Sequence, residues 1–337
     1  MDVFENALKI AHDLCNKNEH ELLYLTKHGS HLYGTNTPSS DHDFKGIFLP
    51  NINNVILGKR KDSLSFKTNK NDRNTKDDVD LELYSLQFWV NTLVKNGETE
   101  GIELLYSHTN RDAVLFINPK MEEILFNKTI LFNPKNCQAF IGFAISHAKT
   151  YFKKSERFGV IKNIYDYVTT IHSGKSEYKL KDVFDDIITK FYHPTYCIEV
   201  NTNEIRSMEI CGKIHQETIL LGEFINRLRK SESSYGHRTR TAADMNNKDW
   251  KSLSSALKAL FEVESLFEQS SIQFPFIDKQ RELLLDIKNG VVDYDDVDRI
   301  INEKIDRVDE LKKVFFVPFW DYNEVEVVKL FKGIYNI

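Results

Sequence analysis

Strict alternation of acidic and apolar residues over 77–84 constrains the fold of this chain more than any other sequence feature. In DDVDLELY the apolar residues Val79, Leu81 and Leu83 alternate with acids. Successive side chains of a strand point to opposite faces, so the segment predicts a strand with one buried face and one acidic face. The sequence therefore requires a half-buried sheet. Three acids lie on its polar face: Asp78, Asp80 and Glu82.

Helix and strand patterns precede and follow this strand. Residues 1–16 carry apolar residues at helical spacing, and 22–28 and 45–50 have the composition of short strands. Helical spacing returns over 85–96, with Ser85 as the expected N-cap. The predicted order of this part is α-β-β-β-α.

A polar stretch lies between the second and third predicted strands. Lys, Asn, Asp, Ser and Thr dominate residues 59–78, which bury too little apolar area to order themselves. We therefore expect a long mobile loop here, placed where it could gate a cleft.

Helical spacing dominates the sequence from about residue 136 onward, and strand alternation is scarce there. Amphipathic helices are predicted over 137–157, 217–230 and 249–267. The fold class expected is α+β. Residues 1–135 would form a domain with a mixed sheet and flanking helices, and 136–337 an all-helical C-terminal domain.

Composition agrees with two globular domains and excludes two classes of protein. The chain has 337 residues, of which 41% are hydrophobic and 28% charged, which excludes disorder over most of its length. Lys and Arg number 45 against 50 Asp and Glu, for a formal net charge of -5. A dedicated nucleic-acid coat protein needs a clear excess of basic residues, so contacts with nucleic acid would have to come from local patches.

The cysteines and the apolar runs indicate where the protein resides. Cys15, Cys137, Cys197 and Cys211 form no C-x-x-C pair and no zinc spacing, so we expect buried thiols in a reducing compartment. No apolar run approaches the roughly 18 residues that span a bilayer, and the N-terminus lacks the pattern of a signal peptide. The expected location is the cytoplasm, without membrane association.

The segment most informative about chemistry is 28–48, HGSHLYGTNTPSSDHDFKGIF. Gly29 lets backbone amides approach an anion closely, and the Ser30 hydroxyl adds a donor, which suits a triphosphate. Asp41 and Asp43, at i and i+2 in an extended segment, point to the same side, as a pair of Mg²⁺ ions requires. This segment therefore predicts a site for a nucleotide and metal.

A third acid is expected from a neighbouring strand. The alternating segment supplies Asp80 as the first candidate and Glu82 as the second, although Glu82 is also consistent with the wet face of an edge strand. Lys45 follows Asp43 by two residues and could approach the phosphates.

These motifs resemble the nucleotidyltransferases of the DNA polymerase β superfamily. Gly-Ser, about ten residues, Asp-x-Asp and a later acidic strand form their pattern, and the segment 28–48 is similar to a branch linked to RNA repair. In that branch the acidic strand has the form D-h-x-h-Y-x-L-x-x-F, which Asp80, Tyr84 and Leu86 match, while Phe88 stands one residue before the final aromatic position. The resemblance implies a palm-like domain with Asp80 as the third metal ligand.

The resemblance extends to the C-terminal part but contains departures. LLLDIKNGVVDYDDV resembles the helix-turn-helix tail of these proteins, with Gly290 at the turn and Asp293 or Asp295 as the next cap. His42 stands between the aspartates where many relatives carry an apolar residue, and Lys45 replaces a frequent arginine. Residues 155–275 match weakly. The region before residue 280 lacks the clear basic helix expected if the acceptor were bound as in the most similar relatives, which leaves the acceptor substrate open.

The activity implied is transfer of an NMP from an NTP to a hydroxyl group, with release of pyrophosphate. Asp41, Asp43 and Asp80 would hold two Mg²⁺ ions, with Mn²⁺ as an alternative, and Gly29 and Ser30 would bind phosphates. No organic cofactor is required. An RNA or tRNA end is the expected acceptor, and a protein side chain or a small molecule stays an alternative.

Two other interpretations of the sequence stay open. The same fold could serve as a catalytically silent, antitoxin-like module that binds a nucleotide or a protein, although three like charges are then unexplained. A metal phosphohydrolase would require more clustered histidines. Basic residues that could contact phosphate lie in the predicted helical domain: Lys149, Lys153, Arg157, His237, Arg238 and Arg240. A basic helix stripe is more often simply a solvated face.

Overall fold

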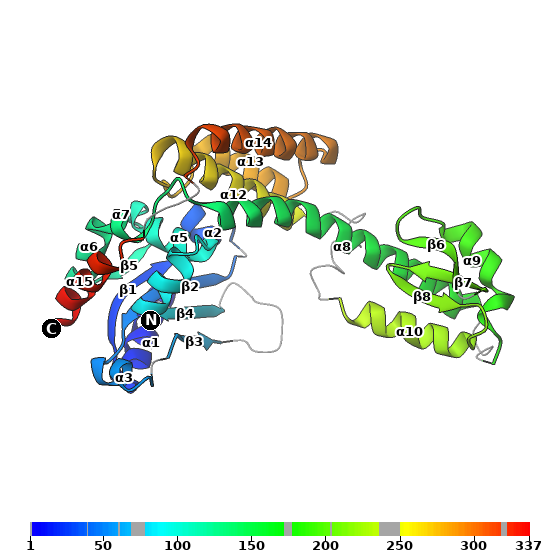
Figure 1. The fold of residues 1–337 in the computed structure, drawn as a ribbon, viewed down its shortest axis with the longest axis horizontal. Coiled ribbons are helices and arrows are strands. Elements are labelled where there is room, and N and C mark those ends of the chain that lie inside the picture. Colours follow the sequence, from blue (N-terminus) through cyan, green and yellow to red (C-terminus); the bar gives the residue numbers. More distant parts are fainter. Residues whose placement is uncertain are drawn as a thin grey trace. The chain divides into compact units, whose positions relative to one another are not determined.

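The computed structural model describes most of the chain (Figure 1). The described residues are 2–38, 40–59, 61–68, 78–171, 177–202, 204–235, 250–317 and 322–337, apart from the side chains of 147–155.

The chain forms two compact units, and one of them is discontinuous in sequence. The first, here called unit 1, comprises Met1–Ile145 with Ser254–Ile337, and unit 2 comprises Ser146–Leu253. This division differs from the expected boundary at residue 135, because the C-terminal helices group with the N-terminal part. Unit 2 is thus an insertion in the sequence of unit 1.

A five-stranded mixed sheet forms the centre of unit 1, in agreement with the expected α+β class. The strand order is β3-β4-β2-β1-β5, and β2 and β4 are parallel while the other neighbours are antiparallel. The strands are β1 (Glu21–Lys27), β2 (His42–Leu49), β3 (Ser63–Lys67), β4 (Val79–Ser85) and β5 (Val114–Ile117). The strand predicted from the acidic alternation is confirmed as β4.

One face of this sheet is apolar and is covered by helix α1 (Val3–Lys17) (Figure 1). Ala7 and Ala11 of α1 pack with Phe44 of β2 and Leu81 of β4 in one buried cluster. Burial of such side chains contributes about 25 cal/mol per Å² of apolar area. The predicted amphipathic helix at the N-terminus is therefore confirmed, and it leaves the acidic face of β4 on the other side.

Short helices connect and follow the strands of unit 1. They are α2 (Ser30–Tyr33), α3 (Ile52–Ile56), α4 (Leu86–Phe88), η1 (Trp89–Val94), α5 (Thr99–Tyr106), η2 (Ser107–Thr109), α6 (Pro119–Phe126) and α7 (Lys128–Leu131). The Ser85 hydroxyl accepts from the Phe88 N–H, which confirms the predicted N-cap. The helix predicted over 85–96 forms in two pieces, because η1 has π-helical hydrogen bonds.

The polar stretch 59–78 is only partly a loop. Leu64 and Phe66 alternate with polar residues in β3 and pack against the sheet, and β3 pairs with the edge of β4. The prediction of a loop is therefore wrong over 63–67, where two apolar side chains suffice to attach an edge strand. Residues 69–77 lie outside the described residues.

The C-terminal helices complete unit 1, and part of this region contacts the segment that follows β1. They are α12 (Trp250–Gln269), α13 (Asp278–Lys288), α14 (Tyr294–Phe315) and α15 (Glu324–Tyr335). The Phe276 N–H donates to the Tyr33 carbonyl (3.2 Å), and Lys288 Nζ donates to the Thr35 carbonyl (3.3 Å). The predicted cap at Asp293 is confirmed, since its side chain accepts from the Asp295 N–H.

Unit 2 contains a small sheet, which corrects the expectation of an all-helical C-terminal half. The antiparallel strands β6 (Cys197–Thr202), β7 (Ile205–Ile210) and β8 (Lys213–Gln216) lie in this order. Unit 2 also contains helices: the latter part of α8 (Gln138–Ile171), η3 (Leu180–Asp182), α9 (Phe184–Phe191) and α10 (Leu221–Ser233). Its own buried cluster includes Ile164, Phe184 and Phe224.

The cysteines are free thiols, and three of the four are buried: Cys15, Cys137 and Cys197. Burial raises the pKa of Cys15 and of Cys137 to about 12, which keeps both thiols protonated. In the part of the chain that is described, no helix is both long and apolar enough to cross a membrane.

Candidate active site

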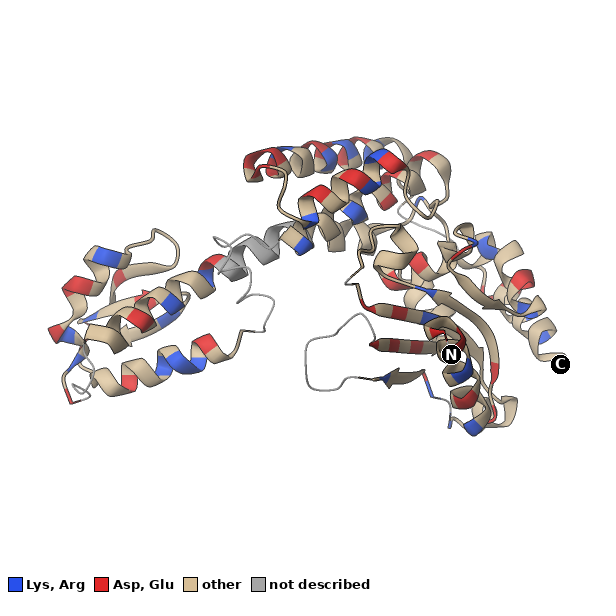
Figure 2. Cartoon of the chain, turned by 180° about the vertical axis from the view of Figure 1, so that it is seen from behind, with Lys and Arg blue, Asp and Glu red and all other residues tan. Residues whose placement is uncertain are grey.

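The parallel pairing of β2 with β4 brings two predicted site residues side by side. Asp43 is the register partner of Asp80, and Lys45 is the partner of Glu82. Register partners on neighbouring strands point to the same face of a sheet, so these four side chains share the face opposite α1. Figure 2 shows acidic residues along β4 and at the start of β2.

Asp41 belongs to the same group, because it precedes β2 and stands two residues before Asp43. Burial raises the pKa of Asp43 above its ordinary value, and the charges of Asp41 and then Asp80 add to that rise. His28 and Lys45 lower it in part. The fields of the three predicted carboxylates therefore overlap at Asp43, as expected of acids that share one site.

Asp80 carries a cationic neighbour from the edge of the sheet. Lys67 Nζ of β3 lies 3.0 Å from Asp80 Oδ2, and this hydrogen bond raises the pKa of Lys67. Lys67 is more than half exposed, so the pair is worth little in stability. Its effect on the site is to offset part of the repulsion among the three aspartates.

Lys45, predicted to approach phosphate, is surrounded by acidic and phenolic groups. Its Nζ lies 3.2 Å from Glu82 Oε2 and 3.1 Å from the Tyr84 hydroxyl, and it forms an ion pair with Glu100 of α5. Only 15% of the Lys45 side chain is exposed. In this arrangement the charge of Lys45 offsets part of the negative charge on the acidic face, and Lys45 is paired with Glu82.

The Gly29-Ser30 turn lies against Asp43. Gly29 has φ +59°, and a Cβ placed on it would lie 2.7 Å from Asp43 Oδ2. The His28 N–H donates to the Asp43 carbonyl (2.8 Å), which fixes the end of β1 beside the start of β2. A side chain at residue 29 would therefore be strained and would collide with a site carboxylate.

The three aspartates are suitable metal ligands, but their side chains are not close enough together to hold one metal ion. Among the described residues, no group of three or more His, Cys, Asp or Glu side chains is placed closely enough to hold a metal ion. The donor set itself fits a hard cation, because Asp43 and Asp80 present carboxylate oxygens on one face of the sheet and the charge of Asp41 acts on Asp43. Mg²⁺ binding would require their side chains to turn toward one another.

Most of the basic residues predicted to contact phosphate fall outside the described part of the chain. The side chains of Lys149 and Lys153 lie outside it, as does the segment 236–249 with His237, Arg238 and Arg240. Arg157 is described, and its guanidinium lies 5.5 Å from the centre of the Tyr196 ring within unit 2.

Sequence reasoning missed a buried charged cluster behind the Gly29-Ser30 turn. His28 Nε2 lies 3.1 Å from Glu103 Oε2, and Lys258 of α12 forms an ion pair with the other oxygen of Glu103. Glu103 and Lys258 are 155 positions apart in the chain, so no local pattern joins them. The only sequence signal was weak, namely an i,i+4 pair of opposite charges at Lys258 and Glu262 on a helix.

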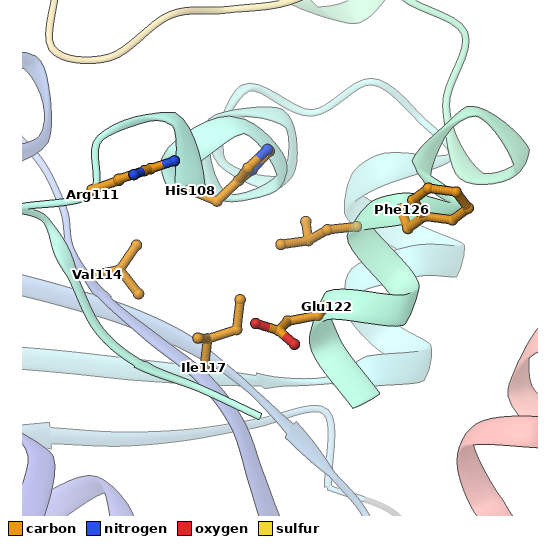
Figure 3. A pocket seen from close by; sticks show the side chains of 7 residues that line it. His108, Arg111, Val114, Ile117, Glu122 and Phe126 are labelled. Carbon is orange, nitrogen blue, oxygen red and sulfur yellow. The ribbon is translucent and has the colours of Figure 1, made fainter. Parts of the chain in front are cut away.

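A separate hollow of about 620 Å³ lies beside β5 (Figure 3). Val114, Ile117 and Leu125 form its apolar lining, and Arg111 and Glu122 face it from two sides. None of the predicted site residues lines it. The hollow contains no paired carboxylates, and its shape alone assigns no chemistry to it.

Comparison with known proteins adds a family and one relative. Residues 6–169 match the model of the RNA repair pathway DNA polymerase beta family. The chain is also 28% identical over 316 residues to the uncharacterized 38.9 kDa protein in the nrdC-mobD intergenic region of Enterobacteria phage T4, and the alignment covers 87% of this chain and 93% of that protein. No solved structure matches the chain.

The matched span contains the Gly29-Ser30 turn, Asp41, Asp43 and Asp80, and it ends within α8. The family points to nucleotidyltransferase activity in general and to partners related to RNA. The resemblance to polymerase β-like nucleotidyltransferases linked to RNA repair is therefore confirmed over residues 6–169, and this part of the chain matches that family.

Proposed function

We propose that the protein is a Mg²⁺-dependent nucleotidyltransferase that transfers an NMP from an NTP to a hydroxyl at an RNA or tRNA end. The observation that carries this proposal is the pairing of Asp43 with Asp80 on adjacent parallel strands, with Asp41 and the Gly29-Ser30 turn beside them. Acids on one sheet face next to a glycine turn suit a bound triphosphate and metal.

Each residue of the site would have a separate role in binding the metal ions or the triphosphate. Asp41 and Asp43 would hold Mg²⁺ and Asp80 would complete the set of ligands; bound there, the ions neutralise charge on the triphosphate and lower the pKa of the attacking hydroxyl. The Gly29 backbone would approach the β and γ phosphates, because no side chain shields it, and the Ser30 hydroxyl would donate to them. Lys45 would keep the acidic face in place through Glu82 and Glu100.

The reaction itself is an in-line displacement. The oxygen of the acceptor hydroxyl forms a bond to the α-phosphorus, and the bond from that phosphorus to the bridging oxygen of the β-phosphate breaks. Pyrophosphate leaves, and Asp80 accepts or orients the proton of the hydroxyl. The protein contributes position and charge, which are the main sources of rate in such transfers.

The distribution of charge between the units favours RNA as the acceptor. Residues 146–253 carry 18 Lys and Arg against 14 Asp and Glu, whereas the rest of the chain carries 27 against 36. Three basic residues of α10 are exposed: Arg227, Arg229 and Lys230. A local basic surface of this kind can bind phosphates even though the whole chain is acidic.

An incubation with labelled substrate tests the activity and the acceptor together. Each NTP, labelled at the α-phosphate, is incubated with the protein, Mg²⁺, and separate pools of cellular RNA and protein. We expect label in RNA. Label confined to protein would show that the acceptor is a protein and not RNA. The absence of label in every pool would reject the proposed activity.

Neutralising the basic residues of α10 should weaken RNA binding and its dependence on salt. In Arg227→Gln/Arg229→Gln/Lys230→Gln, the slope of log Kobs against log [salt] should fall by about 0.7 for each phosphate that the variant no longer neutralises. A filter-binding titration of single-stranded RNA at several salt concentrations measures this slope. Arg299→Gln/Arg307→Gln/Lys312→Gln on α14 removes the same charge from unit 1 and should leave the slope unchanged. Equal slopes in both triple variants would show that the basic residues of α10 do not bind RNA.

The Lys67–Asp80 ion pair favours a second candidate function, a catalytically silent module that binds a nucleotide or a protein on the same fold. In that case Lys67 would permanently neutralise the third acid of the site. NTP binding without any transfer, and unchanged in Asp80→Ala, would favour this second function over catalysis.

A further inference from the structure

Glu103 of α5 binds both side chains that flank the Gly29-Ser30 turn. The Tyr33 hydroxyl donates to Glu103 Oε2 (2.6 Å), and His28 Nε2 lies 3.1 Å from the same oxygen. Glu103 is only 3% exposed and His28 only 8%. One buried oxygen thus joins residue 28 at one end of the turn to residue 33 at the other.

The second oxygen of Glu103 is held by α12. Lys258 Nζ forms an ion pair with Glu103 Oε1, lies 3.6 Å from Glu262 Oε2, and sits 4.3 Å from the centre of the Tyr33 ring. Lys258 is 12% exposed and Glu262 is fully buried. The cluster therefore contains two carboxylates and one lysine, together with His28 and Tyr33.

The charges of this cluster follow from its burial. Burial alone would raise the pKa of Glu103, but Lys258 and then His28 outweigh it and hold that pKa well below its usual range. Burial raises the pKa of Glu262 well above its usual range, and Glu103 adds to this rise. Glu103 is thus the ionised acid of the pair and Glu262 the protonated one, so that Lys258 neutralises a single carboxylate.

Both oxygens of Glu103 accept hydrogen bonds. Oε1 accepts from Lys258, and Oε2 accepts from Tyr33 and His28. An amide at this position has only one oxygen, and its NH₂ group would face either Lys258 or the two donors at Tyr33 and His28. A buried charge left without its partner is strongly unfavourable, so the neighbours would move. The position of the turn therefore depends on a carboxylate at residue 103.

We propose that Glu103 is a positioning residue for the phosphate-binding turn, and that Lys258 of α12 fixes Glu103 in the orientation that holds the turn beside Asp43. This inference rests on the proposed function, in which the turn contacts the NTP. Helix α12 thereby contributes to nucleotide binding, although the side chains of α12 need not touch the nucleotide.

Two variants separate positioning from folding. Glu103→Gln disturbs the whole cluster, whereas Tyr33→Phe removes one donor and keeps the ring, which packs 5.8 Å from Phe274 and 6.1 Å from Phe276 between ring centres. Glu264→Gln is the matched control, because Glu264 of α12 forms a partly buried pair with Lys304 (2.8 Å) and does not reach the turn.

The first measurement is NTP affinity. Each protein is titrated calorimetrically with each of the four NTPs in Mg²⁺, without acceptor, well below its melting temperature. We expect Glu103→Gln to weaken binding at least tenfold and Tyr33→Phe about threefold, while Glu264→Gln binds as the wild type. In transfer assays the two turn variants should raise KM for the NTP more than they lower kcat. Wild-type affinity in both turn variants would overturn the inference.

The second measurement does not depend on catalysis. Hydrogen–deuterium exchange of the amides of residues 29–33 should be faster in Glu103→Gln and Tyr33→Phe than in wild type, and unchanged in Glu264→Gln. Unchanged exchange in the turn variants would overturn the positioning role. Absence of NTP binding by the wild-type protein would instead reject the proposed function, so the two failures are distinguishable.

Discussion

The variant Asp41→Ala/Asp43→Ala is expected to lower the rate of NMP transfer by about a thousandfold or more. Both acids precede or begin β2 on the sheet face that Asp80 shares, and one remaining carboxylate holds Mg²⁺ poorly. Folding should survive the change, because removal of two neighbouring like charges abolishes the repulsion among the three aspartates. Initial rates of label transfer, with melting temperatures of both proteins, measure the effect.

A matched variant makes this result specific. Asp13→Ala removes an exposed acid from α1, which lies on the opposite face of the sheet, and should transfer at the wild-type rate. Transfer by Asp41→Ala/Asp43→Ala at a rate close to that of Asp13→Ala would show that the two aspartates do not hold the metal ions.

Gly46→Ala is expected to destabilise unit 1 by about 3 kcal/mol. A Cβ at residue 46 would collide with the Tyr24 carbonyl oxygen and would lie 2.8 Å from Leu83 Cδ2. The carbonyl belongs to β1, which pairs with β2 along its length, so it cannot withdraw without breaking the sheet beside the site. Urea denaturation followed by circular dichroism measures the loss.

Gly142→Ala is the control for this substitution. A Cβ at Gly142 would meet no atom within 4 Å, and the residue is exposed on α8. Alanine in a helix is favoured over glycine by about 0.5–1 kcal/mol, so the control should be slightly more stable than the wild type. An unchanged urea midpoint in Gly46→Ala would contradict the close approach of β1 to β2 at this position.

The sheet and the acids on it could be predicted from sequence because local alternation carries that information. The acidic strand is confirmed as β4, and the caps at Ser85 and Asp293 form as their residue types indicate. The resemblance of the segment 28–48 is confirmed by the family match. The roles of the individual site residues stay predictions.

Other parts of the fold depend on contacts that no local pattern records. The edge strand β3 has only two apolar residues and is ordered by pairing with β4. The strands of unit 2 are short and partly exposed. Ile198 and Val200 of β6 do alternate with Glu199 and Asn201, but β8 has only four residues and one buried side chain, so the pattern of the sheet as a whole is weak. The grouping of Ser254–Ile337 with the N-terminal part likewise rests on tertiary contacts alone.

The charged partners of the site residues come from distant segments of the chain, so the sequence does not predict them. Lys45 was expected near phosphate, yet its neighbours Glu82 and Glu100 come from a second strand and a helix. The buried pair of Glu103 with Lys258 joins residues 155 positions apart. Charges in such a cluster are buried by the fold itself, and their partners become visible only in three dimensions.

The origin of the transferred phosphorus tests the central claim most directly. Two samples of the same NTP, one labelled at the α-phosphate and one at the γ-phosphate, are incubated with the protein, Mg²⁺ and RNA. The proposed nucleotidyl transfer predicts label in RNA from the α-labelled NTP only, with the γ label released in pyrophosphate. Label in RNA from the γ-phosphate, or from neither, would contradict it.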